Sequence, residues 1–278
     1  MSDTGALFLA LGASLVWGVA DFVGPLWGRT FGALRVMLWA QAGGLAAMAL
    51  AVAARGQGPH GAAILLAAPA ALSGTLGLYA YYRGMAVGAI SVVAPIAGAS
   101  AVVPVAFGIA AGDSPSAAQL AGIGCAILGV ALASFERQPG ARRVAAGAGL
   151  AVLAAIGFGF YFPPMHAAGR ADFWWASLLF RATSLAVVAS TVAVRRPPLR
   201  LGRRDLAVVV AVGIGDTLGN VLYAASSGHG LVSLTSVLAS LYPVVTVLLA
   251  ARVLRERIAP AQRVGIALTL AGVVLIAF

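Results

Sequence analysis

Residues 205–227 carry three polar side chains at helical spacing within an otherwise apolar run. Asp216, Asn220 and Tyr223 occur at i, i+4 and i+7 of the segment AVVVAVGIGDTLGNVLYAAS, so a helix places them on one face. A carboxylate, an amide and a phenol on one face can hydrogen-bond a small solute, and an unpaired carboxylate in such a place can exchange protons. We therefore expect a solute-binding stripe, in which Asp216 is also a candidate for proton coupling.

Two further ionisable residues lie deep in apolar runs. Asp21 follows Trp17 by four residues, whereas Arg181 lies 13 residues before the end of a run at 194 and Asp216 lies 11 residues after the next run begins at 205. A charge near the bilayer centre costs about 2.5–3.5 kcal/mol, so each of these residues needs a partner or a water-filled cavity. An ion pair between Arg181 and Asp216 and a solute-binding Asp216 are equally favoured.

Aromatic residues accompany these polar groups. Trp17 and Asp21 share a helical face, and the corresponding helix of the second half offers Phe158 and Phe162. These rings either form cavity walls for a planar or amphipathic solute or only pack between helices. The remaining candidates for solute binding are a histidine and three tyrosines near the end of an apolar run, some of which could instead mark the membrane interface: His166, Tyr79, Tyr81 and Tyr82.

The composition indicates a membrane environment for all of these residues. Apolar residues make up 61% of the chain and charged residues 9%, and the mean hydropathy is +0.98, whereas a soluble domain carries roughly 25% charge. A membrane span needs about 20 apolar residues, and in lipid such runs must form helices. The expected spans are 5–28, 33–54, 62–85, 88–111, 116–135, 145–168, 173–194, 205–227, 231–254 and 259–278. The sequence therefore predicts an all-α integral membrane protein with ten transmembrane helices.

The net charge of +10 would suggest a nucleic-acid partner in a soluble protein, but the placement of the charge gives a better explanation. All 18 basic residues are arginine, and they gather in the odd-numbered breaks between spans, whereas the even-numbered breaks hold little beyond Arg55 and Arg170. By the positive-inside rule the odd breaks are cytoplasmic and both termini periplasmic, an orientation that a miscounted span would invert. We expect no nucleic-acid partner. The single cysteine and scattered histidines give no metal-site spacing, and no cofactor is expected.

The sequence repeats itself at a shift of about 142 residues. GTLG (74–77) lies over DTLG (216–219), with Gly74 facing Asp216, and VVPV (102–105) lies over VVTV (244–247). The shift becomes 143 from Gln119 onward, and a weaker match at 141 sets Trp17-Gly18 against Phe158-Gly159. We expect two five-helix units, 1–137 and 144–278. Since five is odd, the second unit is inverted in the membrane, an arrangement typical of secondary transporters with a central site.

Two segments resemble a known family. ASLVWGVADFVGP (13–25) and the region 241–274, which includes RERIAPAQRVG (255–265), are similar to the EamA-type branch of the drug/metabolite transporter superfamily. The residues that fit are Pro243, Glu256, Arg257, Pro260, Gln262 and Gly265, whereas GDSPSAAQ (112–119) replaces the Glu-Arg element in the first half. The resemblance implies a ten-helix carrier for efflux or exchange of small metabolites across the bacterial inner membrane, and it leaves the substrate open.

The leading hypothesis is a secondary exporter of amino acids or related compounds that works by alternating access, with protons as a possible coupling partner at Asp216 or Asp21. A second hypothesis is efflux of organic cations and drugs, which would need an exposed carboxylate. A third is a membrane enzyme that acts on lipid-linked substrates. We do not expect an enzyme, because no loop exceeds about ten residues and no acid/base constellation appears at a membrane face.

Overall fold

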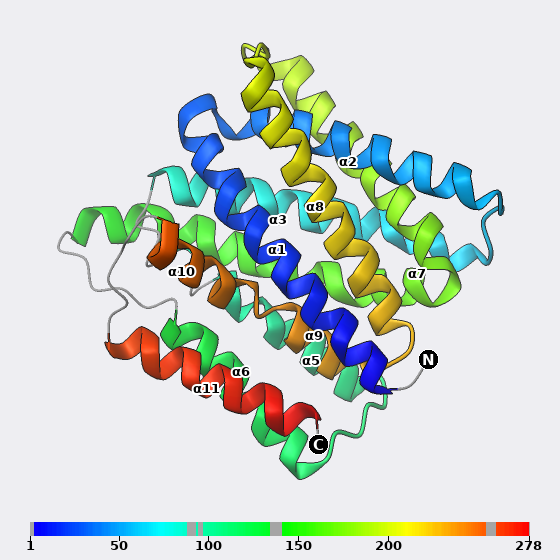
Figure 1. Cartoon of the computed structure of the whole chain (residues 1–278), viewed down its shortest axis with the longest axis vertical. Coiled ribbons are helices and arrows are strands. Elements are labelled where there is room, and N and C mark those ends of the chain that lie inside the picture. Colours follow the sequence, from blue (N-terminus) through cyan, green and yellow to red (C-terminus); the bar gives the residue numbers. More distant parts are fainter. Residues whose placement is uncertain (1–2, 88–92, 94–96, 134–140, 254–259, 278) are drawn as a thin grey trace.

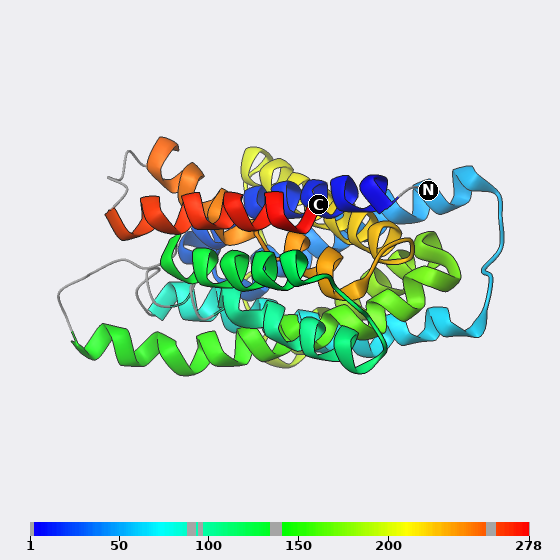
Figure 2. The ribbon, with the colours of Figure 1, turned by 90° about the horizontal axis from the view of Figure 1, so that it is seen from below.

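A computed structural model describes residues 3–87, 93, 97–133, 141–253 and 260–277, and all regular secondary structure in these ranges is helical. The helices run side by side (Figures 1 and 2). They are α1 (Asp3–Phe31), α2 (Ala33–Arg55), α3 (Ala67–Val87), α5 (Val102–Ala110), α6 (Ala117–Ala133), α7 (Ala141–Arg195), α8 (Arg203–Ser227), α9 (Val232–Ala239), α10 (Tyr242–Val253) and α11 (Pro260–Ala277), with the 3₁₀ turns η1 (Ala62–Leu66) and η2 (Ala99–Ala101). The all-α prediction is thus confirmed for these residues.

Five helical stretches of the described chain are long and apolar enough to cross a membrane. They are Thr4–Phe31, Ala33–Arg55, Ala62–Val87, Gly149–Arg195 and Arg203–Ser227. The fourth stretch covers the predicted sixth and seventh spans, which meet at the non-helical residue Asp172 (φ −161°, ψ 102°). The other four predicted spans correspond to shorter apolar helices, so the number of ten spans stays a prediction.

Some expected features fall where the structure gives no description. The start of the predicted span 88–111, the predicted boundary at 137 and the Glu256-Arg257 element lie outside the described residues. The predicted span 231–254 is described almost completely, and it consists of two helices, because α9 ends at Ala239 and α10 begins at Tyr242. Pro243 stands in the first turn of α10, where a proline, which lacks an N–H group, is tolerated.

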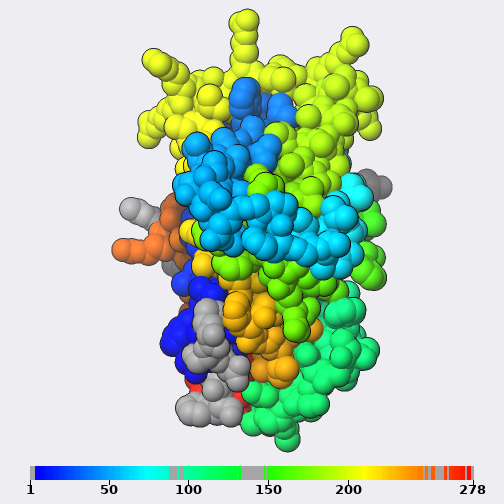
Figure 3. Space-filling model, turned by 90° about the vertical axis from the view of Figure 1, so that its right-hand side faces the viewer, coloured from blue at the N-terminus to red at the C-terminus, as the bar shows by residue number. Residues whose placement is uncertain are grey.

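The helix ends form two polar faces. On the arginine-rich face, defined by residues 29–32 and 195–204, the Trp27 indole N–H donates to Asp205 Oδ1 (3.2 Å) and the Trp39 indole N–H donates to the Leu199 carbonyl (2.9 Å). The opposite face contains the loops at 56–61 and 228–231 and the break at Asp172 (Figure 3). The two tryptophan bonds hold the first turn of α8 and the loop between α7 and α8 against α1 and α2.

Glycines let the helices approach backbone to backbone. The pairs in contact include α1 with α8, α3 with α7, and α6 with α11. A Cβ atom on Gly157 of α7 would lie only 2.6 Å from the Cα of Gly77 in α3. Small residues at such crossings allow the close packing that holds helices together in lipid.

The crossing at Gly157 can be tested with a matched glycine of the same helix. Gly157→Ala is expected to lower the free energy of unfolding by about 1–3 kcal/mol, because the new methyl group overpacks the contact with α3. Gly149→Ala is the control, since a Cβ at Gly149 meets no atom within 4 Å. Thermal unfolding in detergent should give a lower midpoint for the first variant alone. A midpoint for Gly157→Ala at or above that of the control would contradict this packing.

Candidate functional site

A cavity lies between α1, α2, α3, α7, α8 and α10. The empty space among its lining atoms, including the side that opens outward, is about 540 Å³. Its lining consists of Trp17, Asp21, Gln41, Gly74, Thr75, Leu78, Phe158, Tyr161, Phe162, Phe180, Asp216, Asn220 and Tyr242. Apolar and aromatic walls with a few converging polar groups are typical of a solute-binding site.

An ion pair crosses the middle of this site. The guanidinium of Arg181 donates to the carboxylate of Asp216 and to the side-chain oxygen of Gln41. The Arg181 side chain is 1% exposed, whereas that of Asp216 is 23% exposed. The buried cation is therefore neutralised by its partner, while part of the Asp216 carboxylate remains open to the cavity. The predicted pair and the predicted place of Asp216 at the cavity thus occur together.

The three polar residues of the stripe on α8 have different surroundings. The Asn220 side-chain amide donates to the Asp216 carbonyl (2.7 Å), and the Trp17 indole N–H donates to the same carbonyl (3.3 Å). Tyr223, the third member of the stripe, is fully buried, and its hydroxyl contacts Ser236 Oγ (2.9 Å) and donates to the Phe162 carbonyl (3.3 Å). Asp216 and Asn220 line the cavity, whereas Tyr223 lies behind its wall.

An aromatic layer covers one side of the cavity. Ring centroids are 5.9 Å apart for Trp17 and Tyr161, 5.2 Å for Tyr161 and Phe162, and 4.9 Å for Phe162 and Tyr223. These three pairs meet edge to face, the arrangement that the charge distribution of aromatic rings favours. Because Phe162 and Tyr223 lie toward the ends of their helices at the opposite face, we infer that the layer separates the cavity from that face.

Asp21 is the second carboxylate of the site. Its side chain is nearly buried, and it lines both the main cavity and a smaller adjoining one that also contains Tyr82 and Arg181. Among the described residues, no hydrogen-bond or ion-pair partner contacts the Asp21 carboxylate. The site therefore holds one carboxylate with a cationic partner and one without.

Comparisons with known proteins identify the kind of molecule to which this cavity belongs. Residues 145–278 match the model of the EamA-like transporter family. The chain contains an EamA-like transporter domain. The match covers slightly less than half of the chain, and it agrees with the resemblance of 241–274 to transporters of the drug/metabolite type.

The likeness in fold extends beyond the matched residues 145–278. A crystal structure of a protein that is 20% identical in sequence superimposes with a TM-score of 0.80 and covers 99% of both chains. At this identity the likeness concerns the fold alone. No curated protein matches the transporter in sequence.

The structure places the other predicted site residues outside the main cavity lining. Tyr81 is fully buried and packs against Phe158 with ring centroids 5.9 Å apart. Tyr82 lines only the smaller cavity, Tyr79 lines neither cavity, and His166 is half-buried one turn beyond Phe162 in α7. Their roles in binding stay predictions.

The sequence reading missed several lining residues, of which Gln41 had a detectable signal. It is a buried polar residue in the middle of the apolar helix α2, so the cost of burying an amide points to a partner, and Arg181 is that partner. Thr75, Tyr161, Phe180 and Tyr242 gave no such signal, because rings and hydroxyls in apolar helices commonly pack between helices.

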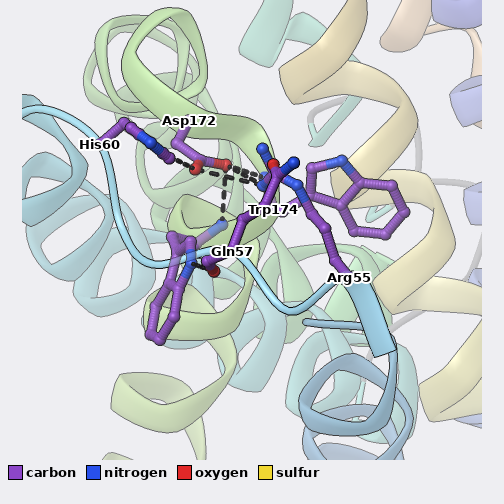
Figure 4. A network of polar contacts seen from close by, with 6 residues as sticks. Arg55, Gln57, His60, Asp172 and Trp174 are labelled. Atoms are coloured by element: carbon purple, nitrogen blue, oxygen red, sulfur yellow. Dashed lines mark hydrogen bonds and ion pairs between the residues drawn. The ribbon is translucent and has the colours of Figure 1, made fainter. Parts of the chain in front are cut away.

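A second polar cluster of the transporter lies at the break in α7 (Figure 4). Asp172 Oδ1 accepts the backbone N–H groups of Trp174 (3.0 Å) and Trp175 (3.3 Å), as a helix N-cap does. Arg55 donates to both carboxylate oxygens (3.0 and 3.2 Å), and His60 Nδ1 lies 3.4 Å from Oδ2. The cluster therefore fastens the loop between α2 and α3 to the beginning of the second half of α7.

These bonds also determine the pKa of Asp172. Burial by itself raises the pKa of this carboxyl, but the Trp175 N–H, the Arg55 guanidinium and the His60 ring favour the ionised form and bring the net pKa below its usual value. A lowered pKa means that ionised Asp172 stabilises the fold above its unfolded pKa of about 3.9. This contribution is lost as the pH falls through the lowered pKa.

The ion pair predicts that the same substitution has different effects at the two aspartates of the cavity. Asp216→Asn leaves Arg181 as a buried cation without an anion, and it is expected to reduce the free energy of unfolding by about 3–5 kcal/mol. Asp21→Asn is expected to retain the thermal midpoint, because no described cation contacts Asp21. Unfolding of both variants in the same detergent provides the measurement, and equal midpoints would show that the pair does not stabilise the protein.

The Asp172 cluster gives a prediction about pH. The difference in thermal midpoint between the wild type and Asp172→Asn is expected to shrink below about pH 4, as the carboxyl becomes protonated. Asp205→Asn, a matched change on the arginine-rich face, serves as a control for general acid effects. A difference that grows as the pH falls below about 4 would refute a lowered pKa.

Proposed function

We propose that this transporter exports small metabolites, amino acids or related compounds, by alternating access of the central cavity to the two sides of the membrane. The observation that carries the proposal is a cavity with aromatic walls in which a paired and an unpaired carboxylate face the same space. The carboxylate of Asp216, the amide of Asn220 and the rings of Trp17 and Phe158 suit a solute with both a charged group and an apolar part.

Contacts between the two proposed halves, 1–137 and 144–278, support an inverted repeat. A Cβ on Gly219 would lie 2.5 Å from the ring of Trp17, and a Cβ on Gly77 would lie 3.0 Å from the ring of Phe158. Each contact is the equivalent of the other in the sequence repeat. Gly77 corresponds to Gly219 at a shift of 142, and Trp17 corresponds to Phe158 at a shift of 141.

A second pair of contacts follows the same rule. A Cβ on Gly18 would overlap Val245, and a Cβ on Gly159 would lie 2.6 Å from Val103. Gly18 corresponds to Gly159 and Val103 corresponds to Val245 in the same two registers. Two contacts that exchange when the halves exchange are what a two-fold relation between the halves requires.

The last helices of the two halves supply a third pair. A Cβ on Gly122 would lie 2.9 Å from the Gly272 carbonyl, and a Cβ on Gly129 would lie 2.7 Å from the Gly265 carbonyl. At the shift of 143 these contacts also interchange. With five spans in each half, such a two-fold axis lies in the membrane plane, as in transporters that alternate by rocking one half against the other.

The central ion pair breaks this proposed symmetry. Two contacts of threonine hydroxyl groups show which residues of α2 and of the second half of α7 correspond in the repeat. Thr75 donates to Ser184 (2.9 Å), and Thr217, the counterpart of Thr75, lies against Gly44. Gly44 then corresponds to Ser184 at a shift of 140.

At that shift Gln41 corresponds to Arg181, and the two side chains bond to each other across the proposed axis. Asp216 corresponds to Gly74, and both line the cavity. One half thus offers a carboxylate where the other offers a glycine, which suits a solute that binds in one orientation.

We assign proton coupling to Asp21 in preference to Asp216. The Asp216 carboxylate already compensates the buried Arg181, so protonating it would leave a cation without a partner. Asp21 has no described cation to stabilise its ionised form, and so it can alternate between the two protonation states at a lower cost. This asymmetry distinguishes two carboxylates that the sequence alone leaves equivalent.

Organic-cation efflux remains the second candidate, because the unpaired Asp21 shares a helical face with Trp17, and a carboxylate beside an aromatic ring also suits a cation. For either solute we propose the bacterial inner membrane as the location. The arginine-rich face would be cytoplasmic, and both termini would be periplasmic.

Transport by purified protein in proteoliposomes tests the proposal. Labelled neutral amino acids are expected to exchange across the membrane and to accumulate on the more acidic side when a pH gradient is imposed, because protons move against the solute. Asp21→Asn should keep exchange without a gradient and lose accumulation driven by the gradient. Asp205→Asn, outside the cavity, should keep both.

Three outcomes would contradict parts of this proposal. Exchange of organic cations alone would favour the drug-efflux alternative. Loss of gradient-driven accumulation in Asp216→Asn but not in Asp21→Asn would overturn the assignment of proton coupling. Absence of any exchange, with turnover of a lipid-linked substrate, would favour a membrane enzyme.

A further inference from the structure

A charged pocket opens on the opposite face, the side that Figure 3 views. Its empty space is about 580 Å³, and its polar lining consists of Arg55, His60, Arg170, Asp172 and His229. Arg55 and Arg170 are the two arginines that the sequence places in the breaks with few basic residues. Both arginines therefore line the same pocket. The positive-inside rule explains why arginines are rare on this face, but it does not explain why these two lie together.

The described acidic groups near this pocket do not neutralise it. The oxygens of Asp172 are engaged by two backbone N–H groups, Arg55 and His60. Asp113, another acid near this face, accepts the backbone N–H of Ser233 (2.8 Å). No described carboxylate contacts Arg170, and His229 Nδ1 contacts only the Ala225 carbonyl (2.8 Å). The pocket thus keeps an uncompensated guanidinium beside a second arginine that Asp172 holds in place.

The floor of the pocket lies at the contact between α7 and α8, on the side of the central cavity that carries the aromatic layer. Gly169 and Gly228 line the pocket, and a Cβ on Gly169 would lie 2.7 Å from the Ala224 carbonyl, so α7 and α8 touch there. About two turns deeper, Phe162 and Tyr223 form part of the aromatic layer. The pocket is therefore at the outer end of the contact that separates the cavity from this face.

Unpaired polar atoms lie along that contact. Ser226 Oγ and Ser233 Oγ are buried without a hydrogen-bond partner among the described residues. Burying such atoms without a partner is costly, and native proteins rarely keep them without a reason. A state in which α7 separates from α8 and α9 would hydrate these atoms or bring them to a passing solute. Ser226 therefore lies between Tyr223 of the aromatic layer and Gly228 of the pocket.

We propose that this pocket is a binding site for the carboxylate of a solute at the outer mouth of its route, with Arg170 as the anion-binding residue and His229 beside it. The proposal deepens the proposed export function and rests on it. Guanidinium groups bind carboxylates through paired, charge-assisted hydrogen bonds, which suits this chemistry. The bonds from Asp172 hold Arg55 and His60 in position around the same space.

Equilibrium binding to the purified full chain in detergent tests the site without any transport step. Succinate is the probe, succinamide is its neutral counterpart, and tryptophan emission is the readout, since Trp174 and Trp175 adjoin Asp172. Succinate is expected to bind, and succinamide is not. Arg170→Gln should weaken succinate binding by about tenfold or more, because a hydrogen bond to a charged group contributes about 1.5–3 kcal/mol.

Arg195→Gln, a matched substitution of an exposed arginine on the arginine-rich face, should leave succinate binding unchanged. The proposal is overturned if succinate does not bind, if succinamide binds equally well, or if the two arginine variants behave alike. Loss of transport with succinate binding intact would count against the export function alone. Transport with no succinate binding would count against this site alone.

Discussion

A buried guanidinium must be neutralised, and this requirement organises the centre of the molecule. Arg181 is 1% exposed and is held by Asp216 from α8 and Gln41 from α2. In a medium of low dielectric constant, removing one partner of such a pair is far more costly than its net contribution to stability would suggest. The three helices must therefore keep these side chains at one depth, and that depth is where the cavity lies.

The surrounding helices form an aromatic region around the site and a polar region beyond it. Gly77, Gly157 and Gly219 bring α1, α3, α7 and α8 close enough for the rings of Trp17 and Phe158 to enclose the site. Beyond Phe162 and Tyr223 the chain becomes polar again and ends at a charged pocket. Cavity, aromatic layer, unpaired polar atoms and outer pocket thus follow one another along α7 and α8, as expected for a route that is closed on one side.

The sequence predicted best where a side chain is costly to bury. Asp21 and Asp216 stood out because charges in apolar runs need a reason, and both line the cavity. Helical periodicity placed Tyr223 on the same face of the helix as Asp216. Periodicity gives the direction of a side chain but does not reveal which neighbour covers that side chain, and Phe162 covers Tyr223. Tyr161 and Phe180 could not be distinguished from packing residues. The break between α9 and α10 was also missed, since an apolar run of sufficient length gives no sign of being divided.

The central claim is that the cavity opens to one side of the membrane at a time, and the accessibility of Leu78 tests it most directly. Leu78 lines both the main and the smaller cavity. Leu78→Cys, with Cys125 replaced by serine, can be treated with a membrane-impermeant maleimide in right-side-out and inside-out vesicles. Labelling from both sides, with transported solute shifting the ratio of the two rates, is expected. Labelling from one side only under every condition would contradict alternating access.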